Sequence, residues 1–348
     1  MTADSFGREM SVEEVQARSA AYFTREGTGA RCQLCPHNCR LKPGQAGLCR
    51  VRECREGGKL VTRSYGSVSS IALDPVEKKP LYHYYPGSTI LSLGSFGCNL
   101  RCQYCQNWQI SQQVLEARAI TPQAVAELAQ AYGNEGCIGA AFTYNEPAIW
   151  YEFVWDAAEH IKAAELAVVL VTNGYMSPKP WRELLTRVDA VNVDIKGWRE
   201  EFYRRLCGGR LEPVLDNVEV ARELCHVELT YLIVPGCNDD DDSIRGFARW
   251  VSERLGRGTP VHFSRYFPNY SLDIEATPIS TMEKAHRLAQ EQLDFVYLGN
   301  VNLPGTADTY CAQCRSVLIG RSPAYAPRIL ADDGRCPACG EPVPWVFH

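Results

Sequence analysis

The sequence lacks several features that would assign it to a common class. None of its apolar runs reaches the roughly 18 residues that a membrane-spanning helix needs, and the opening MTADSFGREMSVEEVQARSA lacks the basic start and apolar core of a secretory signal. Positive charge is not in excess, since 36 Lys and Arg stand against 41 Asp and Glu. The net charge of −5 gives no general attraction to nucleic acid or to an anionic membrane. We therefore expect a cytoplasmic protein with neither a membrane nor a nucleic acid as partner.

Repeats and nucleotide-binding glycine motifs are also missing. No internal repeat or low-complexity tract is present, and no G-x-G-x-x-G follows a strand-like run, which weakens a Rossmann interpretation. Cysteine, in contrast, is abundant, with 16 in 348 residues. Because cytosolic thiols stay reduced, clustered cysteines there more often bind metal than form disulfides. Three clusters take eleven of them, and we expect buried or incidental thiols at Cys54, Cys137, Cys207, Cys225 and Cys237.

The pattern from about residue 91 to residue 301 predicts an α/β fold. Helical stretches such as TPQAVAELAQAY, with Thr121 as N-cap, alternate with apolar strand-like runs. These runs are TILSLGSFG, CIGAAFTYN, AVVLVTNG, AVNVDIKG, VELTYLIVPG, PVHFSRYFP and FVYLGNV. Such an alternation indicates a parallel sheet covered on its faces. Six units and a seventh terminal strand fit an open or partial TIM-type barrel better than a doubly wound sheet.

Two cysteine-rich segments flank this core. We divide the chain into an N-terminal metal-binding segment (1–85), the α/β core (86–304) and a C-terminal segment (305–348). A short helix is expected near Val12–Phe23. The cysteine cluster after it lies among turn residues, so we expect a loop-rich knot with little helix or strand.

Three cysteines follow the first core strand, in GCNLRCQYCQNW. Cys98, Cys102 and Cys105 have C-x3-C-x2-C spacing, and loops after the strands form the active face of a parallel barrel. Four thiolates would close a metal site, whereas three leave a position open. A [4Fe–4S] cluster held by three cysteines keeps one iron without a protein ligand. The alternative is a zinc site completed by a distant ligand.

With Tyr104 before its last cysteine, this motif resembles the signature of radical S-adenosylmethionine (SAM) enzymes. The resemblance implies a partial (β/α)6 barrel and a [4Fe–4S] cluster on Cys98, Cys102 and Cys105. It also implies reductive cleavage of SAM to a 5′-deoxyadenosyl radical that abstracts hydrogen from a substrate. In this interpretation, residues 86–304 are the radical SAM core.

The stretches CQLCPHNCRL, DPVEKKPLYHYYPGS and YLIVPGCNDD make the chain resemble the AmmeMemoRadiSam system radical SAM enzymes, relatives of the pyruvate formate-lyase activating enzyme. This closer resemblance covers roughly residues 30–340. It implies an activating-enzyme-like oxidoreductase with an unidentified substrate, an electron donor such as flavodoxin or ferredoxin, and candidate partners of the Memo type. Activation of a glycyl radical on a protein backbone is one form of this reaction. A catalytically silent, metal-bearing docking scaffold is the alternative from another class.

The resemblance to radical SAM enzymes also assigns SAM-binding residues at successive strand ends. FTYNEP stands where the family usually has Gly-Gly-Glu, so Glu146 would take the SAM ammonium group, while Tyr144 and Asn145 replace the glycines. Lys196 would pair with the SAM carboxylate. Taken singly, these residues also suit a turn, a solvated loop or a helix start. The residues expected to bind the cofactor or line the mouth are Tyr104, Asn145, Glu146, Thr172, Asn173, Asp194, Lys196 and His262.

The C-terminal cluster resembles a zinc ribbon. Cys311, Cys314, Cys336 and Cys339 have C-x2-C-x21-C-x2-C spacing, which supplies four thiolates for a tetrahedral Zn²⁺. Rubredoxin-type iron uses the same ligands. A closed site of this kind would be structural or would dock a partner.

The N-terminal cluster is compatible with two cofactors. Cys32, Cys35, Cys39 and Cys49 suit either zinc or a second iron–sulfur cluster, with zinc or another structural metal preferred, and His37 is a less favoured ligand. Thiol–disulfide chemistry at CQLC is a less favoured alternative, because no thioredoxin-like βαβ pattern surrounds it. Between this cluster and the core, residues 82–85 (Tyr-His-Tyr-Tyr) would either cap or line the barrel or pack as an aromatic segment.

Overall fold

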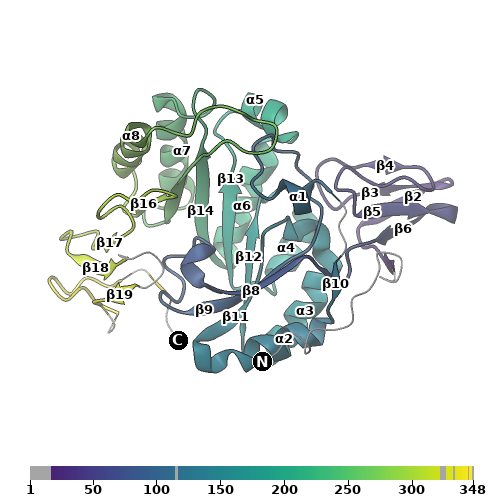
Figure 1. Cartoon of the computed structure of the whole chain (residues 1–348), viewed down its shortest axis with the longest axis horizontal. Helices are drawn as coiled ribbons and strands as arrows, with labels where there is room; N and C mark the ends of the chain where they lie inside the picture. Colours follow the sequence, from purple (N-terminus) through teal and green to yellow (C-terminus); the bar gives the residue numbers. More distant parts are fainter. Residues whose placement is uncertain (1–16, 114–116, 322–326, 332–333, 344, 347–348) are drawn as a thin grey trace.

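The computed structural model describes residues 17–113, 117–321, 327–331, 334–343 and 345–346. At its centre lies an eight-stranded sheet in the order β16-β15-β14-β13-β12-β11-β9-β8 (Figure 1). The seven strands from β9 to β16 are parallel, and all seven predicted strands are present. Their bounds are β9 (Thr89–Gly94), β11 (Cys137–Phe142), β12 (Ala167–Thr172), β13 (Ala190–Ile195), β14 (His226–Ile233), β15 (Val261–Arg265) and β16 (Val296–Gly299). The predicted α/β fold with a mostly parallel sheet is confirmed.

One strand of the sheet was not predicted. β8 (Ser70–Pro75) pairs antiparallel with β9, so the sheet begins before residue 86. The edge strands β8 and β16 are not neighbours in the hydrogen-bonding order, so the sheet is open.

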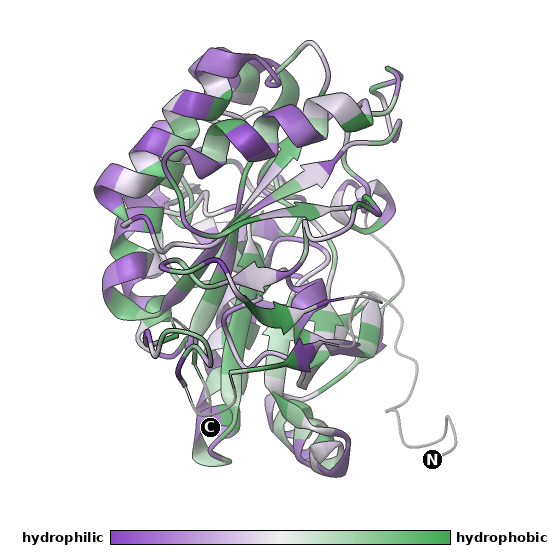
Figure 2. Cartoon of the chain, turned by 90° about the vertical axis from the view of Figure 1, so that its left-hand side faces the viewer, coloured by the Kyte–Doolittle hydropathy of each residue, from purple (hydrophilic) through white to green (hydrophobic). Residues whose placement is uncertain are grey.

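Helices connect and cover the parallel strands, and apolar residues are concentrated in the central strands (Figure 2). Thr121 caps α2 as predicted, because its Oγ1 accepts from the Ala124 backbone N–H at 3.1 Å. A 3-10 turn (Pro147–Trp150) leads into α3. The helices are α1 (Trp108–Ser111), α2 (Pro122–Ala131), α3 (Tyr151–Ala163), α4 (Pro178–Leu185), α5 (Glu200–Phe202), α6 (Glu212–Leu224), α7 (Asp241–Arg254) and α8 (Ile279–Gln290). No helix in the described ranges is both long and apolar enough to cross a membrane.

The segment after β8 packs against the sheet strands. The Pro80 carbonyl accepts from Asn192 Nδ2 at 2.8 Å, and the backbone N–H groups of Tyr82 and His83 donate to Glu228 at 2.9 and 2.7 Å. His83 and Tyr84 are buried. Of the two sequence interpretations for residues 82–85, the structure therefore shows aromatic packing.

The N-terminal segment is richer in strands than predicted. Two three-stranded antiparallel sheets form, ordered β1-β6-β5 and β2-β3-β4. Their strands are β1 (Arg18–Ser19), β2 (Phe23–Glu26), β3 (Gly29–Cys32), β4 (Arg40–Leu41), β5 (Arg52–Arg55) and β6 (Lys59–Thr62). The predicted helix near Val12–Phe23 is wrong where it can be checked, because Arg18–Ser19 and Phe23 are in strands; residues 12–16 lie outside the described residues.

Two smaller sheets complete the chain. β7 (Ser67–Val68) pairs with β10 (Arg118–Ala119). At the C-terminal end, β17 (Thr309–Tyr310), β18 (Val317–Gly320) and β19 (Arg328–Ile329) form a three-stranded antiparallel sheet at the opposite end of the molecule from β1–β6 (Figure 1). This end has its own small core around Leu318, Ile319 and Trp345. The division of the chain at residues 85 and 304 stays a prediction.

Candidate active site

The three-cysteine loop begins where β9 ends, at the carboxyl edge of the parallel sheet. Asn145, after β11, holds its first residues: Asn145 Oδ1 accepts from the Ser95 backbone N–H at 2.8 Å, and Nδ2 donates to the Gly97 carbonyl at 3.1 Å. Gly97 has a φ of +85°, a conformation that glycine adopts without strain. The predicted cofactor residue Asn145 thus shapes the cysteine loop from a neighbouring strand.

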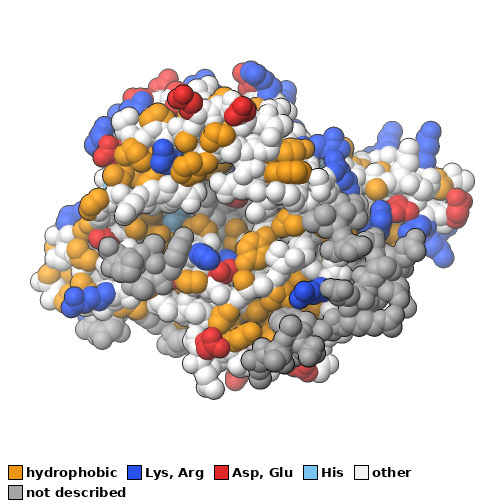
Figure 3. Space-filling model, viewed as in Figure 1, with side chains coloured by type: hydrophobic (Ala, Val, Ile, Leu, Met, Phe, Trp, Pro, Cys, Tyr) orange, Lys and Arg blue, Asp and Glu red, His pale blue; other side chains and the backbone are white. Residues whose placement is uncertain are grey.

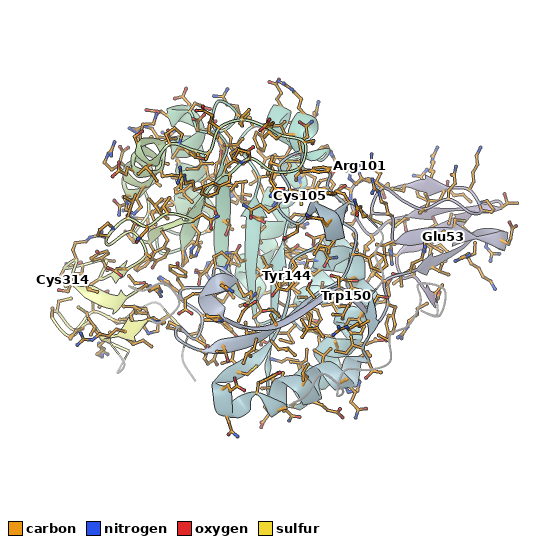
Figure 4. The ribbon with its side chains drawn as sticks, viewed as in Figure 1. Glu53, Arg101, Cys105, Tyr144, Trp150 and Cys314 are labelled. Carbon is orange, nitrogen blue, oxygen red and sulfur yellow. The ribbon has the colours of Figure 1, made fainter. Side chains whose placement is uncertain are left out.

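Cys98, Cys102 and Cys105 line one pocket of about 340 Å³ (Figure 4 marks Cys105). Polar groups contact the sulfurs. The Leu100 N–H donates to Cys98 Sγ at 3.3 Å, and the Ser111 hydroxyl, which donates its proton to the Asn107 carbonyl, lies 3.2 Å from Cys105 Sγ. Burial raises the pKa of the Cys98 and Cys105 thiols. Without a metal these two thiols therefore keep their protons, and a metal that binds the sulfurs would displace those protons.

The three sulfurs fit a cluster better than a single ion. In a tetrahedral zinc site, sulfurs about 2.3 Å from the ion lie about 3.8 Å from one another. Among the described residues, only Cys311, Cys314, Cys336 and Cys339 form a group of three or more metal-ligating side chains whose ligand atoms all lie within 4.8 Å. The pocket cysteines do not form such a compact group, which agrees with thiolates that bind different irons of a cluster.

Glu146 lies on the wall of the same pocket and is buried. Its carboxylate accepts from the Ala148 N–H at 2.9 Å, the Thr172 hydroxyl at 2.6 Å and the Asn173 N–H at 2.8 Å. Burial raises its pKa, although these hydrogen bonds oppose the shift. Because a carboxylate has about four acceptor positions, one remains for a further donor in the pocket.

The ends of β12 and β13 bring the other predicted residues together. Asn173 Nδ2 lies 3.6 Å from Cys98 Sγ and 2.9 Å from Asn99 Oδ1, so this side chain touches the cysteine loop. Lys196 Nζ pairs with Asp194 Oδ2 at 2.8 Å. Burial disfavours the charged form of Lys196, but the Asp194 carboxylate outweighs this effect and raises its pKa. Thr172, Asn173, Asp194 and Lys196 all line the pocket.

His262 is not where the sequence suggested. It is the second residue of β15, and Ser264, two residues later, lines the pocket. His262 is buried, with Nε2 2.6 Å from Glu228 Oε2 and its ring stacked on Tyr297. The expected position at the mouth is wrong, because β15 continues for three residues after His262. His262 therefore lies inside the sheet, below the carboxyl edge where Ser264 lines the pocket.

Tyr144 explains how the chain departs from the expected Gly-Gly-Glu stretch. It has a φ of +71°, so a tyrosine adopts the left-handed conformation that favours glycine. Its hydroxyl donates to Asp74 Oδ2 at 2.7 Å. A non-glycine residue thus adopts the left-handed conformation here, and its side chain is anchored by Asp74.

Sequence reasoning missed a polar wall of the pocket. Lys78 and Lys79 line it, and their ammonium groups lie 3.1 and 2.7 Å from the two oxygens of Asp74. Burial tends to raise the Asp74 pKa, but Lys79, Tyr144 and Lys78 together hold it well below its usual range. Both lysines belong to the stretch DPVEKKP, but nothing in that sequence pattern predicts that they line a pocket. Asn192, Thr230 and Ser264 also line the pocket.

Tyr104 is a buried pocket residue with an unexpected partner. Its hydroxyl lies 3.1 Å from the sulfur of Cys207, one of the cysteines expected to be buried or incidental, and Cys207 is indeed buried. Cys207 ends a π-helical turn (Tyr203–Cys207) that adjoins the cysteine loop, because the Arg101 N–H donates to the Cys207 carbonyl at 2.7 Å.

The C-terminal cysteines form a compact group far from this pocket. Cys311 Sγ lies 3.6 Å from Cys339 Sγ, and Cys314 Sγ lies 3.6 Å from Cys336 Sγ. These distances match the edge of about 3.8 Å expected around one tetrahedral ion. Figure 4 shows Cys314 at the opposite end of the molecule from Glu53, with Cys105 between them. The cluster could therefore hold a metal such as zinc, remote from the active-site candidate.

Comparison with known proteins agrees with this geometry. The model of the radical SAM superfamily matches residues 93–251, which include the three-cysteine loop and the segments after β11, β12 and β13 that carry Glu146, Asn173 and Lys196. The chain belongs to the radical SAM superfamily. Uncharacterized protein MJ0808 of Methanocaldococcus jannaschii is 42% identical, over 95% of this chain and 100% of its own length.

Relatives with named activities are more distant. The pyruvate formate-lyase 1-activating enzyme of Escherichia coli K12 is 28% identical over 42% of this chain and 62% of its own length. The GTP 3′,8-cyclase of Lactiplantibacillus plantarum is 26% identical over 41% and 45%. The crystal structure of Streptococcus suis SuiB bound to precursor peptide SuiA superposes with a TM-score of 0.51 at 11% identity, covering 65% of this chain and 52% of that one. That likeness concerns the fold alone.

Proposed function

We propose that this protein is a radical SAM enzyme that binds a [4Fe–4S] cluster through Cys98, Cys102 and Cys105 and cleaves SAM reductively. The observation that carries the proposal is the convergence of these three sulfurs and the Glu146 carboxylate on one pocket of about 340 Å³. When bound, the cluster supplies one electron to the SAM sulfonium, which yields a 5′-deoxyadenosyl radical for hydrogen abstraction.

The pocket residues have distinct roles in this proposal. Glu146 uses its remaining acceptor position for the ammonium group of SAM, and Thr172 and Asn173 fix its carboxylate. Lys196 turns toward the SAM carboxylate while Asp194 keeps it charged. Asn145 and Asn173 hold the cysteine loop, and Tyr104 closes the pocket beside Cys102.

The test is SAM cleavage by the reconstituted protein. Anaerobic protein loaded with iron and sulfide should release 5′-deoxyadenosine when SAM and dithionite are added. The Cys102→Ala variant should lose the cluster and this activity while keeping its fold, because the residue lies on a loop. A Cys237→Ala variant, in a partly exposed thiol outside the pocket, is the matched control. Activity that survives in Cys102→Ala would contradict the assignment.

We further propose that the protein is one of the AmmeMemoRadiSam enzymes, with Memo-type proteins as candidate partners and a flavodoxin or ferredoxin as electron donor. A cytoplasmic location and zinc in the C-terminal cluster belong to the same proposal.

The likeness to the pyruvate formate-lyase 1-activating enzyme favours a second candidate, activation of a glycyl radical on a protein. Electron paramagnetic resonance of a candidate partner after incubation with loaded enzyme, SAM and reductant tests it. The docking-scaffold alternative predicts no SAM binding, which calorimetric titration with SAM would reveal.

A further inference from the structure

We propose that the N-terminal cysteines Cys32, Cys35, Cys39 and Cys49 hold a second iron–sulfur cluster, which passes electrons to the cluster in the pocket. The metal site stands on its own evidence, whereas its role as an electron relay rests on the proposed function.

The four N-terminal cysteines converge on one site. They line a single small cavity together with Leu34, His37 and Arg52. Cys32 and Cys49 are buried, and Cys35 and Cys39 are half-buried. Cys39 Sγ and Cys49 Sγ face the same glycine, lying 3.6 and 3.8 Å from the position that a Cβ on Gly47 would occupy. The site therefore has four thiols and a nearly closed interior.

The spread of the sulfurs favours a cluster over zinc. Within the described part of the chain, no three of these four sulfurs lie mutually within 4.8 Å, whereas the four C-terminal sulfurs do. In this respect the N-terminal site resembles the three-cysteine pocket and differs from the compact C-terminal cluster.

The site adjoins the three-cysteine loop. A Cβ on Gly97 would lie 2.6 Å from the Cys49 carbonyl oxygen and 2.5 Å from Val51 Cγ2, so the two backbones are in direct contact one residue before Cys98. The His37 side chain bonds to the Asn99 carbonyl at 2.8 Å, one residue after Cys98. A cluster at the N-terminal site would therefore be a near neighbour of the pocket cluster.

The charge around the site suits an electron-transfer role. Arg52, buried, points Nη1 toward Cys32 Sγ at 3.5 Å and pairs with Glu152. Residues 17–63 contain ten Arg and Lys and three Asp and Glu, in a chain whose net charge is −5. Arg25, Arg40 and Arg50 are exposed, and Figure 3 shows cations over this end of the molecule. An acidic electron carrier would be attracted here.

The proposed transfer is a sequence of one-electron steps. A reduced, low-potential carrier protein with an acidic surface gives one electron to the N-terminal cluster and is itself oxidised by one. That cluster then returns to its oxidised state by reducing the pocket cluster, and no bond is made or broken in either step.

The site is tested by metal counts on anaerobically reconstituted full-length protein. Wild type should contain about eight irons and eight sulfides, and the triple variant C98A/C102A/C105A should keep about four of each, taking each cluster as a cubane. The variant C35A/C39A should also drop to about four, and C54A, at a buried thiol outside the cavity, should match wild type. The triple variant leaves the N-terminal cysteines unchanged, so its iron content tests the N-terminal site even if C35A/C39A misfolds.

A triple variant that holds no iron and two zinc ions per chain would overturn the metal site. The relay is tested separately in C35A/C39A: release of 5′-deoxyadenosine should persist with dithionite and fall at least tenfold with a reduced flavodoxin as donor. Equal rates with flavodoxin in wild type and C35A/C39A would overturn the relay. If wild type releases no 5′-deoxyadenosine even with dithionite, the proposed function is wrong. The iron counts then still test whether the N-terminal cysteines hold a cluster.

Discussion

Glu228 provides the sharpest test of how the segment after β8 is held. The carboxylate is fully buried, and each oxygen accepts from one backbone N–H and one imidazole: Oε1 from His83 N (2.7 Å) and His226 (3.0 Å), Oε2 from Tyr82 N (2.9 Å) and His262 (2.6 Å). A Glu228→Gln substitution keeps the shape but replaces one oxygen with an NH2 group. Whichever way the amide turns, one backbone N–H and one imidazole lose their acceptor.

The expected cost follows from these contacts. A buried donor left without an acceptor costs about 1–3 kcal/mol, and the imidazole can relieve its share by presenting a lone pair to the new NH2 group. We therefore expect Glu228→Gln to lower the free energy of unfolding by about 1–3 kcal/mol, or the Tm by roughly 1.5–4 °C for a chain of 348 residues. Glu253→Gln, at an exposed position in α7, should change it by less than about 0.5 kcal/mol.

The assay combines calorimetry with hydrogen exchange. Calorimetry under anaerobic, reducing conditions gives the Tm. Hydrogen exchange measures the protection of the Tyr82 and His83 amides, which should fall more in Glu228→Gln than the protection of amides in the sheet. Burial tends to raise the Glu228 pKa, but His226 and His262 outweigh it and hold this pKa well below its usual range. The charged form thus contributes stability above about pH 4.3, and this contribution is lost as pH falls through the lowered pKa. A variant that melts within 1 °C of wild type at pH 7, with unchanged protection, would refute this account.

Three further substitutions test other parts of the structure. Tyr144→Phe should lose about 1–2 kcal/mol of stability because Asp74 loses a 2.7 Å hydrogen bond, whereas Tyr270→Phe, at an exposed ring, should not; urea unfolding of both measures this, and equal midpoints would argue against the anchor. Gly97→Ala should lower the iron content, because the new Cβ would collide with Val51 and the Cys49 carbonyl and disrupt packing of the N-terminal segment. Gly236→Ala is the control for backbone strain alone, since Gly236 has a similar positive φ and nothing within 4 Å of its Cβ position. Equal iron contents in the two variants would show that the contact of Gly97 with the N-terminal segment is unimportant. Cys314→Ser should remove the C-terminal metal and make residues 309–346 sensitive to trypsin while leaving the sheet intact, because that end has a separate core; Cys237→Ser is the control, and an unchanged metal content would exclude Cys314 as a ligand.

Long apolar strands were predictable, whereas short strands and their ends were not. The seven parallel strands consist mostly of buried residues, so their sequence signal does not depend on distant contacts. The two N-terminal sheets use strands of two to four residues among turn residues, which look like loops until they pair. A shift of two residues along β15 decides whether a side chain reaches the pocket, and the sequence run PVHFSRYFP did not fix where the strand ends. Glu228 was hidden for another reason: within VELTYLIVPG it gave no sign of its partners, which come from residues 82, 83, 226 and 262.

The segment from Asp74 to Tyr85 joins two of these findings. At its start, Asp74 holds Lys78, Lys79 and Tyr144 at the pocket wall; farther on, the Tyr82 carbonyl accepts from Arg321 Nη2 at 2.8 Å. Arg321 Nη1 also donates to Thr309 Oγ1 at 2.6 Å, in the sheet next to the C-terminal cysteines. One stretch of backbone thus contacts the pocket, the buried Glu228 and the end of the chain that carries the C-terminal cysteine cluster. Because Arg321 links the C-terminal sheet to this segment, we expect any effect of Cys314→Ser on the proposed SAM binding to pass through the segment. Glu228→Gln should then produce the same effect with the C-terminal cysteines unchanged.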